Sequence, residues 1–331
     1  PLAFEGDVLI AWAKKEGFVR IDLVSGERAP VPEMSIPSTA ADGGGPAGNS
    51  VNPVPLHTLI ARRQWLAQGE ASEIAIWNLN SGEKERSLAE PGFRLRRGGG
   101  DVHRIKRPFA FSPDGSLFAT ANEDHGVRLW NCSDWTFEEL APELKERFRL
   151  CFSPDNRLLA VFSQSDSSPA PDRGVIIDLQ SRRAIAEIEL ASHLLSLVIS
   201  PDGSTLAAGL GNHQIELWDL QSGVRRHSLG GHLAGVFSLA FSPDGRTLAS
   251  TGDNRLILWN VATGSEVTTL IDGRPWLRGA LFSPDGRFLT CYIGNSKLGV
   301  WHAPSWQELK KSEDGDDVDR RAEFSGLPTS E

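Results

Sequence analysis

The sequence predicts an all-β fold in which one small antiparallel sheet is repeated along the chain. Phe or Ile followed by Ser-Pro-Asp-Gly or Ser-Pro-Asp-Asn occurs five times, and an alternating apolar run that ends in an apolar and a short polar residue occurs seven times. Recurrence at a fixed period is typical of units that cannot bury their own apolar face and therefore stack on copies of themselves.

The spacing of the second phrase sets the size of the unit. Its last three steps are 41, 41 and 42 residues, within the ~40–45 residues of a four-stranded repeat. The seven copies are Ile21-Asp22, Trp77-Asn78, Trp130-Asn131, Ile177-Asp178, Trp218-Asp219, Trp259-Asn260 and Trp301-His302. The five copies of the first phrase are residues 111–115, 152–156, 199–203, 241–245 and 282–286.

The best copy shows why these residue types form strands and turns. Apolar residues occupy both faces of 236–241, as expected of a strand buried between stacked sheets. Pro243 presets the backbone of a turn, Asp244 can accept hydrogen bonds from backbone amides, and Gly245 tolerates left-handed geometry. Further strands are then expected at residues 247–251, 255–260 and about 267–270.

With these phrases the chain resembles the WD-repeat β-propeller family, in the form of bacterial-type WD-repeat domains, over nearly all of its length. The resemblance implies an all-β, seven-bladed β-propeller of four-stranded antiparallel blades, in a single domain at residues 1–311. The expected blades are about 1–32, 55–90, 103–140, 147–190, 193–229, 232–271 and 277–311.

Two features at the ends of the chain leave alternatives open. Residues 312–331 are an acidic tail that could pair with the first blade as a closing strand, begin an eighth blade, or stay irregular. Because the chain starts at Pro1 and in the apparent end of a first strand, we expect it to be cut from a longer protein.

Composition favours a globular protein of a reducing compartment. The chain is 40% hydrophobic and 23% charged, with a formal net charge of −9, and no segment approaches the ~18 apolar residues of a membrane span. Cys132, Cys151 and Cys291 are too few and too scattered for a disulfide framework or a zinc site. With no secretion leader in the sequence, we expect a cytoplasmic protein that binds no membrane.

One set of side chains has the composition of a hydrolase triad. His232, Ser250 and Asp253 occur in the sixth blade, and His103, Thr120 and Asp124 recur in the third. Recurrence argues against catalysis, which needs a single exposed nucleophile beside an oxyanion hole. The family resemblance implies instead a structural hydrogen-bond network, completed by Trp259 and Trp130. The fifth blade has Gly211 in place of the Asp and the fourth has no Trp, and we expect both blades to be looser.

Other catalytic motifs are absent from the sequence. It contains no phosphate-binding loop, no His-Glu-x-x-His, no nucleophile elbow and no dinucleotide fingerprint in a strand–helix context. We therefore expect no catalytic residues, no cofactor and no metal.

The repeats become irregular on one face of the predicted disc. Insertions lengthen the first three repeats to 56, 53 and 47 residues, at 30–53, 91–102, 141–145 and 163–173. Alternating strand direction places all four on the face that carries the blade-to-blade crossovers. Loops displayed on a rigid scaffold are the usual carriers of recognition, although long loops are also merely tolerated.

A basic cluster stands out among these loops. It consists of Arg94, Arg96, Arg97, Arg104, Lys106 and Arg107, against the single acid Asp101. Arginine forks bind phosphate and carboxylate groups, so the cluster predicts an acidic or phosphorylated protein or peptide partner. Pairing with the acidic tail, or simple solvation, is the alternative. The acidic remainder of the chain disfavours nucleic acid.

Trp276, in a crossover on the same face, is predicted either to anchor a partner or to cap the core between two blades. The sequence as a whole predicts a non-catalytic protein–protein interaction scaffold that presents its loop-rich face. Two alternatives stay open: a sensor or targeting module of a larger signalling enzyme, and a propeller enzyme with a site in its channel.

Overall fold

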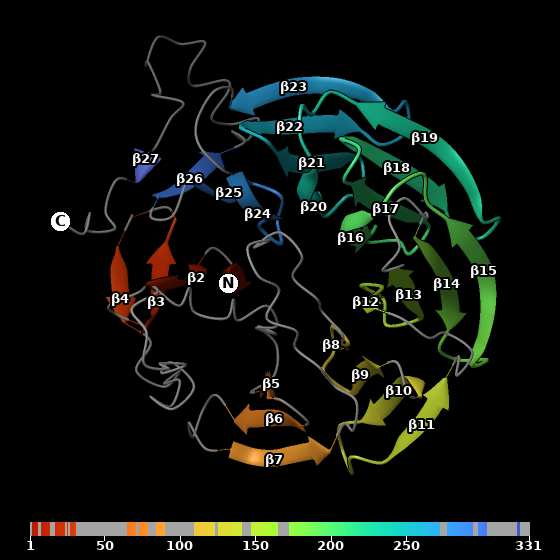
Figure 1. Ribbon diagram of the computed structural model, residues 1–331. Helices are drawn as coiled ribbons and strands as arrows, with labels where there is room; N and C mark the ends of the chain where they lie inside the picture. Colours follow the sequence, from red (N-terminus) through yellow and green to blue (C-terminus); the bar gives the residue numbers. More distant parts are fainter. Residues whose placement is uncertain are drawn as a thin grey trace, which may run out of the picture. The chain divides into compact units, whose positions relative to one another are not determined.

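The computed structural model describes the chain in segments, and all of its regular elements are β-strands (Figure 1). The described residues are 2–5, 8–13, 17–23, 25, 27–30, 65–70, 73–78, 84–89, 109–122, 125–140, 147–164, 172–271, 277–293, 297–302 and 323–324. Within these segments no helix is long and apolar enough to cross a membrane.

The chain divides into two compact units, Pro1–Leu150 and Cys151–Glu331. The first unit holds three antiparallel sheets of sequentially ordered strands. One consists of β1 (Leu2–Glu5), β2 (Val8–Ala13), β3 (Gly17–Asp22) and β4 (Arg28–Pro30), and a second of β5 (Trp65–Glu70), β6 (Glu73–Asn78) and β7 (Lys84–Ala89). The third consists of β8 (Phe109–Phe111), β9 (Leu117–Asn122), β10 (Gly126–Asn131) and β11 (Phe137–Leu140).

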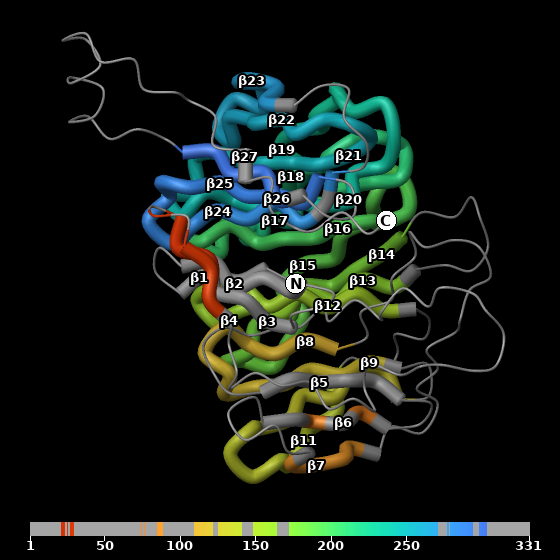
Figure 2. The backbone as a smooth tube through the Cα atoms, turned by 90° about the vertical axis from the view of Figure 1, so that its left-hand side faces the viewer, coloured from red at the N-terminus to blue at the C-terminus, as the bar shows by residue number. Residues whose placement is uncertain are grey.

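The second unit repeats the same plan in four-stranded sheets, the first of which begins at the boundary between the units. Its sheets are β12 (Arg147–Phe152), β13 (Leu158–Gln164), β14 (Arg173–Asp178) and β15 (Arg183–Glu189), then β16 (Leu194–Ile199), β17 (Thr205–Leu210), β18 (Gln214–Asp219) and β19 (Val224–Gly230). They continue with β20 (Val236–Phe241), β21 (Thr247–Gly252), β22 (Arg255–Asn260) and β23 (Ser265–Ile271), and β24 (Leu277–Phe282), β25 (Phe288–Ile293), β26 (Lys297–His302) and β27 (Glu323–Phe324). The order can be followed along the tube from green to blue in Figure 2.

Neighbouring sheets of the second unit pack face to face, with their first strands side by side. β16 contacts β20, and β20 contacts β24, while β15, β19 and β23 lie on the outer rim of this unit (Figure 1). A core cluster that includes Ala207, Leu217, Val236 and Leu248 spans two successive sheets. The second strand β17 is buried along its whole length, because it has a sheet face on either side. This repeated, laterally packed sheet is the blade of a β-propeller.

Trp135 joins two sheets of the first unit in a different way. It occupies the β10–β11 turn with φ 59°, a conformation that is strained for a bulky residue. Its ring is buried and packs in one cluster with Ile74, Ile76 and Phe118. The apolar contact with the neighbouring sheet offsets the backbone strain.

The Ser-Pro-Asp-Gly phrase forms the predicted turn between the first and second strands. Ser242 Oγ donates to Asp244 Oδ1 at 2.5 Å and accepts from the amide of Thr247 at 3.0 Å, and Asp244 Oδ1 accepts from the amide of Arg246. Gly245 has φ 70°. Asn156, which replaces the glycine in one copy, has φ 60°, in agreement with the tolerance of Asn for this region. Side-chain and backbone bonds together close the hairpin.

The last sheet differs from the sequence prediction. β27 pairs antiparallel with β26, with Leu298 opposite Phe324 and Gly299 opposite Glu323. The predicted blade ended at residue 311, and none of the three alternatives for the tail had it complete the last sheet. The number of blades in the ring stays a prediction.

Acid should weaken the turns in a defined pH range. Burial opposes ionisation of Asp285, but hydrogen bonds from Ser283 and Arg287 outweigh it and lower its pKa from 3.8 to about 2. A carboxyl whose pKa is lower in the folded state adds stability above its unfolded pKa and loses it as the pH falls. Replacing Asp285 with Asn should therefore destabilise the protein above pH ~4, and the difference should shrink toward pH ~2.

Urea unfolding of the original chain and of Asp285→Asn between pH 6 and pH 2 would measure this difference. Glu187→Gln, at an exposed glutamate on β15, serves as the control. A stability difference that does not change with pH would contradict the role given to the ionised carboxyl.

Candidate functional site

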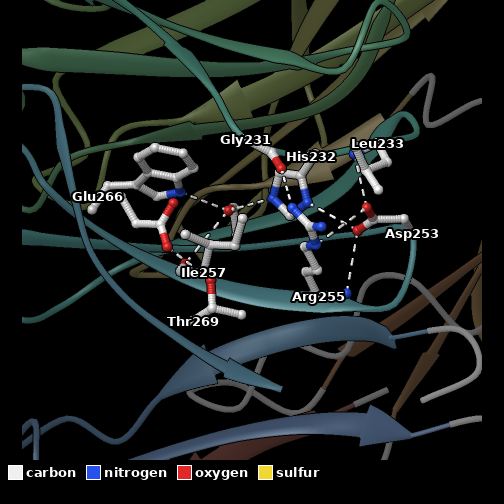
Figure 3. Close-up of polar contacts among 10 residues, drawn as sticks. Gly231, His232, Leu233, Asp253, Arg255, Ile257, Glu266 and Thr269 are labelled. Carbon is white, nitrogen blue, oxygen red and sulfur yellow. Dashed lines mark hydrogen bonds and ion pairs between the residues drawn. The ribbon is translucent and has the colours of Figure 1, made fainter. Parts of the chain in front are cut away.

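A continuous chain of hydrogen bonds crosses the sheet of β20–β23 and ends at its crossover loop (Figure 3). Trp259, on β22, donates its indole N–H to Ser250 Oγ, on β21, at 2.7 Å. Ser250 Oγ lies 2.7 Å from Nε2 of His232, which belongs to the crossover between β19 and β20. The sequence-predicted His232, Ser250 and Trp259 are thus brought together in one buried network.

Asp253 extends the network to the surface. Its carboxylate lies 3.2 Å from His232 Nδ1 and accepts the backbone amide of Leu233 at 2.8 Å. Arg255, two residues farther on, donates to the carbonyl of Gly231 at 2.7 Å. Side chains of the β21–β22 turn therefore hold three consecutive crossover residues, 231 to 233.

Burial favours the neutral form of His232. Desolvation lowers the pKa of His232 below 6.5, and Asp253 opposes this shift without cancelling it. The neutral imidazole donates Nδ1–H to Asp253, accepts the Ser250 hydroxyl at Nε2, and leaves Ser250 Oγ to accept from Trp259. Every polar group of the chain Trp259–Ser250–His232–Asp253 then has a partner.

This arrangement is unsuited to nucleophilic catalysis. Ser250 is 0% exposed, and its oxygen already accepts the indole N–H of Trp259. A nucleophile has to be reached by a substrate beside an oxyanion hole. The geometry favours the structural interpretation of these three residues over the catalytic one.

The sheet of β8–β11 contains the inner half of the same network. Trp130 donates its indole N–H to Thr120 Oγ1 at 3.0 Å, and both side chains are buried. Their positions match those of Trp259 and Ser250 in strand register. His103 and Asp124, the other two predicted members, lie outside the described residues.

The sheet of β16–β19 uses a residue that sequence reasoning missed. Register places Ala208 where the other sheets have Ser250 or Thr120, so the indole of Trp218 has no hydroxyl to bind. Glu216, 0% exposed, accepts the indole N–H at 3.0 Å and Arg225 at 2.6 Å. The expectation that this blade is looser was incomplete, because its indole is satisfied by a different acceptor. A glutamate within an otherwise apolar third strand was the available signal.

His193 also differs from the pattern of the sixth blade. A methyl group on Gly211 would lie 1.9 Å from His193 Nε2, so the imidazole lies directly against the glycine that replaces the expected aspartate. A larger residue there would displace the histidine.

The predicted partner-binding residues Arg94, Arg96, Arg97, Arg104, Lys106, Arg107 and Trp276 lie outside the described residues, and their role stays a prediction. Within the part of the chain that the structure describes, no cluster of three or more His, Cys, Asp or Glu is arranged to hold a metal ion.

Removing the Ser250 hydroxyl, which binds both Trp259 and His232, should destabilise the protein. Ser250→Ala leaves the indole N–H of Trp259 and the Nε2 of His232 unsatisfied in the core, which should lower the free energy of unfolding by about 2–4 kcal/mol. Ser250→Ala and Trp259→Phe should couple by about 1–2 kcal/mol in a double-mutant cycle. The reason is that Trp259→Phe removes the indole N–H that Ser250→Ala leaves without an acceptor.

Denaturant unfolding of the two single variants and the double variant measures this coupling, with exposed Ser228→Ala as the control. Additive effects of the two changes would show that the hydroxyl and the indole do not act as one unit.

The substitute acceptor in the β16–β19 sheet allows a rescue experiment. Glu216→Ala should destabilise the protein by about 1–3 kcal/mol, since the indole of Trp218 loses its acceptor. Adding Ala208→Ser should recover about 1 kcal/mol by restoring a hydroxyl at the position of Ser250. In the original chain the same Ala208→Ser change should stabilise nothing, because Glu216 already binds the indole.

Thermal unfolding of the four proteins gives the comparison. Equal effects of Ala208→Ser with and without Glu216 would contradict the assignment of Glu216 as the replacement acceptor.

Comparison with known proteins agrees with this architecture. The family model described as "WD domain, G-beta repeat" matches residues 98–131, 187–219 and 223–260. An uncharacterized WD repeat-containing protein of Synechocystis sp. is 32% identical over 44% of this chain and 41% of its own length. The meiotic recombination protein rec14 of Schizosaccharomyces pombe is 29% identical over 63% of this chain and 66% of its own length. The chain thus spans less than two thirds of either relative.

A solved structure supports the same conclusion at the level of fold. A chain in the crystal structure of the Mitotic Checkpoint Complex superposes with a TM-score of 0.58, covering 72% of this chain and 71% of that one at 22% identity. The matched repeats show that this chain contains WD repeats between residues 98 and 260, and the repeated four-stranded sheets and the solved structure show a β-propeller fold similar to that of WD-repeat proteins.

Proposed function

We propose that this chain is a non-catalytic interaction scaffold that presents its crossover face to a protein or peptide partner. WD repeats imply protein–protein interaction. The crossover face is the surface that we propose for this interaction. One observation carries it: His232, Asp253 and Arg255 connect the β19–β20 crossover to the β21–β22 turn through two half-buried hydrogen bonds and one exposed hydrogen bond.

A surface fixed in this way is suited to recognition. Ordering a loop on binding costs free energy, so a loop that is already held loses less when a partner docks. The sheets below it are packed on both faces and give a rigid base. Display by a preformed surface needs no chemical step in this chain.

The names of similar proteins support a role in assemblies. The solved structure with the same fold belongs to the Mitotic Checkpoint Complex, and one relative is named a meiotic recombination protein. For this chain the partner is unidentified, and we propose that it carries acidic or phosphorylated groups that bind the cluster of residues 94–107. We also propose a cytoplasmic location, which cell fractionation with an antibody to the chain would test.

A second function is favoured by the lengths of the relatives. The Synechocystis protein is matched over 41% of its length, as expected if such propellers are parts of larger chains. This chain would then be a sensor or targeting module of a signalling enzyme. Sequencing the full reading frame would test it: a linked catalytic domain supports this alternative, and its absence removes it.

The interaction surface can be mapped by site-specific photo-crosslinking in the source cells. A photoreactive amino acid at Asn254, in the turn that holds the crossover, should form an adduct with a partner protein. The same group at exposed Arg246 should form none, because the β20–β21 turn lies at the opposite end of the strand β21 from the β21–β22 turn. Adducts from Arg246 alone would contradict the proposed face.

A charge-reversed variant tests whether the partner also binds the basic cluster of residues 94–107. With Arg96, Arg97, Arg104 and Arg107 changed to Glu, an acidic or phosphorylated partner should no longer be crosslinked from Asn254. If the adduct persists in a folded variant, the chemistry assigned to the partner is wrong while the scaffold face stands.

A further inference from the structure

The repeated Ser-Pro-Asp-Gly turns contain a chemically labile dipeptide. Aspartate rearranges most readily when glycine follows it, because glycine leaves its backbone nitrogen unhindered. Four of the five Ser-Pro-Asp turns have this sequence, and the fifth has Asn156 in place of the glycine. The four pairs are Asp114-Gly115, Asp202-Gly203, Asp244-Gly245 and Asp285-Gly286.

The rearrangement joins two groups of neighbouring residues. The backbone nitrogen of the glycine attacks Cγ of the aspartate, an N–Cγ bond forms, and the carboxyl hydroxyl leaves with the amide proton as water. A second water molecule opens the resulting succinimide ring at either carbonyl and yields aspartate or isoaspartate. Isoaspartate continues the main chain through its side-chain carboxyl, so it lengthens the backbone of the turn by one methylene group.

The nucleophile of this reaction is bound in the folded turns. The amide of Gly245 donates to the carbonyl of Ser242 at 2.8 Å, and the amide of Gly286 donates to the carbonyl of Ser283 at 2.9 Å. The other two Asp-Gly turns contain the same bond. Because the glycine nitrogen must lose its proton to attack, the reaction has to break the hydrogen bond that closes the turn.

The electrophile is bound as well. Asp244 Oδ1 accepts from Ser242 Oγ at 2.5 Å and from the amide of Arg246 at 3.0 Å. These two bonds lower the pKa of Asp244 below 3.8. An ionised carboxylate has no hydroxyl to lose as water, so the turn stabilises the unreactive form of the side chain.

Asp244 is held by fewer hydrogen bonds than the aspartates of the other three turns. All four carboxylates accept from the serine two residues before them and from the amide two residues after them. The other three also accept from the side chain two residues after them, which is Ser116, Ser204 or Arg287. Among the described turns, the one at Asp244 should therefore open most easily.

We propose that the aspartates of the Ser-Pro-Asp-Gly turns are latent sites of isoaspartate formation, suppressed by the closed turn and released by its local opening, with Asp244 the first to react. The serine supplies both the hydroxyl that binds the carboxylate and the carbonyl that binds the glycine amide, so one opening frees both reacting groups. The longer backbone of isoaspartate no longer fits the turn, and a modified turn stays open. The inference is independent of the proposed scaffold function.

Prolonged incubation at neutral pH, followed by peptide mapping that distinguishes isoaspartate from aspartate, tests the inference. In the folded chain isoaspartate should form at Asp244 at least about tenfold more slowly than in the chain unfolded in urea, and faster than at the other three sites. Ser242→Ala should raise the rate at Asp244 about fivefold or more and leave Asp114 unchanged. Ser283→Ala is the matched control, and it should raise the rate at Asp285 instead.

Three outcomes would overturn the inference. These are equal rates at Asp244 in the folded and the unfolded chain, serine variants that leave the rates unchanged, and serine variants that raise the rate at all four sites alike. A different turn as the most reactive one would reject the order assigned to Asp244. Urea unfolding of both serine variants establishes that they are folded. If either variant is not, the original chain with and without urea decides the question.

Discussion

The need of a tryptophan indole N–H for an acceptor shapes three of the described sheets, β8–β11, β16–β19 and β20–β23. Tryptophan closes the third strand because its large ring fills the space between sheets, but its N–H then lies out of reach of water. An unsatisfied buried donor costs about 1–3 kcal/mol. Two sheets meet the need with a hydroxyl, Ser250 or Thr120, and a third with the carboxylate of Glu216. In the β20–β23 sheet Ser250 also binds His232, and the other ring nitrogen of His232 lies beside Asp253. The hydrogen-bond network therefore extends from the core to the crossover.

This coupling explains how the β19–β20 crossover is held in place. The opposite end of the β20–β23 sheet is closed by a local Ser-Pro-Asp turn, whose hydrogen bonds begin and end within a few residues. The crossover, by contrast, is held by residues about twenty positions away in the sequence. A loop tied to the core by long-range bonds keeps one conformation and can present the same groups to every partner. Scaffold function and core packing therefore depend on the same side chains.

The sequence predicted what repeats and failed where the chain departs from the repeat. The turn at Gly245 and the strands of the β20–β23 sheet follow from spacing and residue type alone, since both are local properties. The grouping of His232, Ser250, Asp253 and Trp259 came from the family pattern. Glu216 was missed because a sequence pattern does not show that Ala208, opposite Glu216 on the neighbouring strand, stands where other sheets have a hydroxyl. The pairing of β27 was missed because it joins segments that twenty residues of chain separate.

Exposure of Leu233 is likewise beyond a sequence pattern, which marks leucine as a core residue. In the structure Leu233 lies in the β19–β20 crossover, where its amide donates to Asp253 and its side chain is exposed. Residues that break a local rule while being held firmly are the ones in which function is expected.

The most direct test of this account is the rate of amide hydrogen exchange at Leu233 in the original chain and in Ser250→Ala. If the buried network holds the crossover, protection of the Leu233 amide should fall much more than that of Leu256, a residue of the β21–β22 pairing. If protection at both amides falls in parallel, or at Leu233 not at all, the crossover is ordered independently of the core and the central claim is wrong.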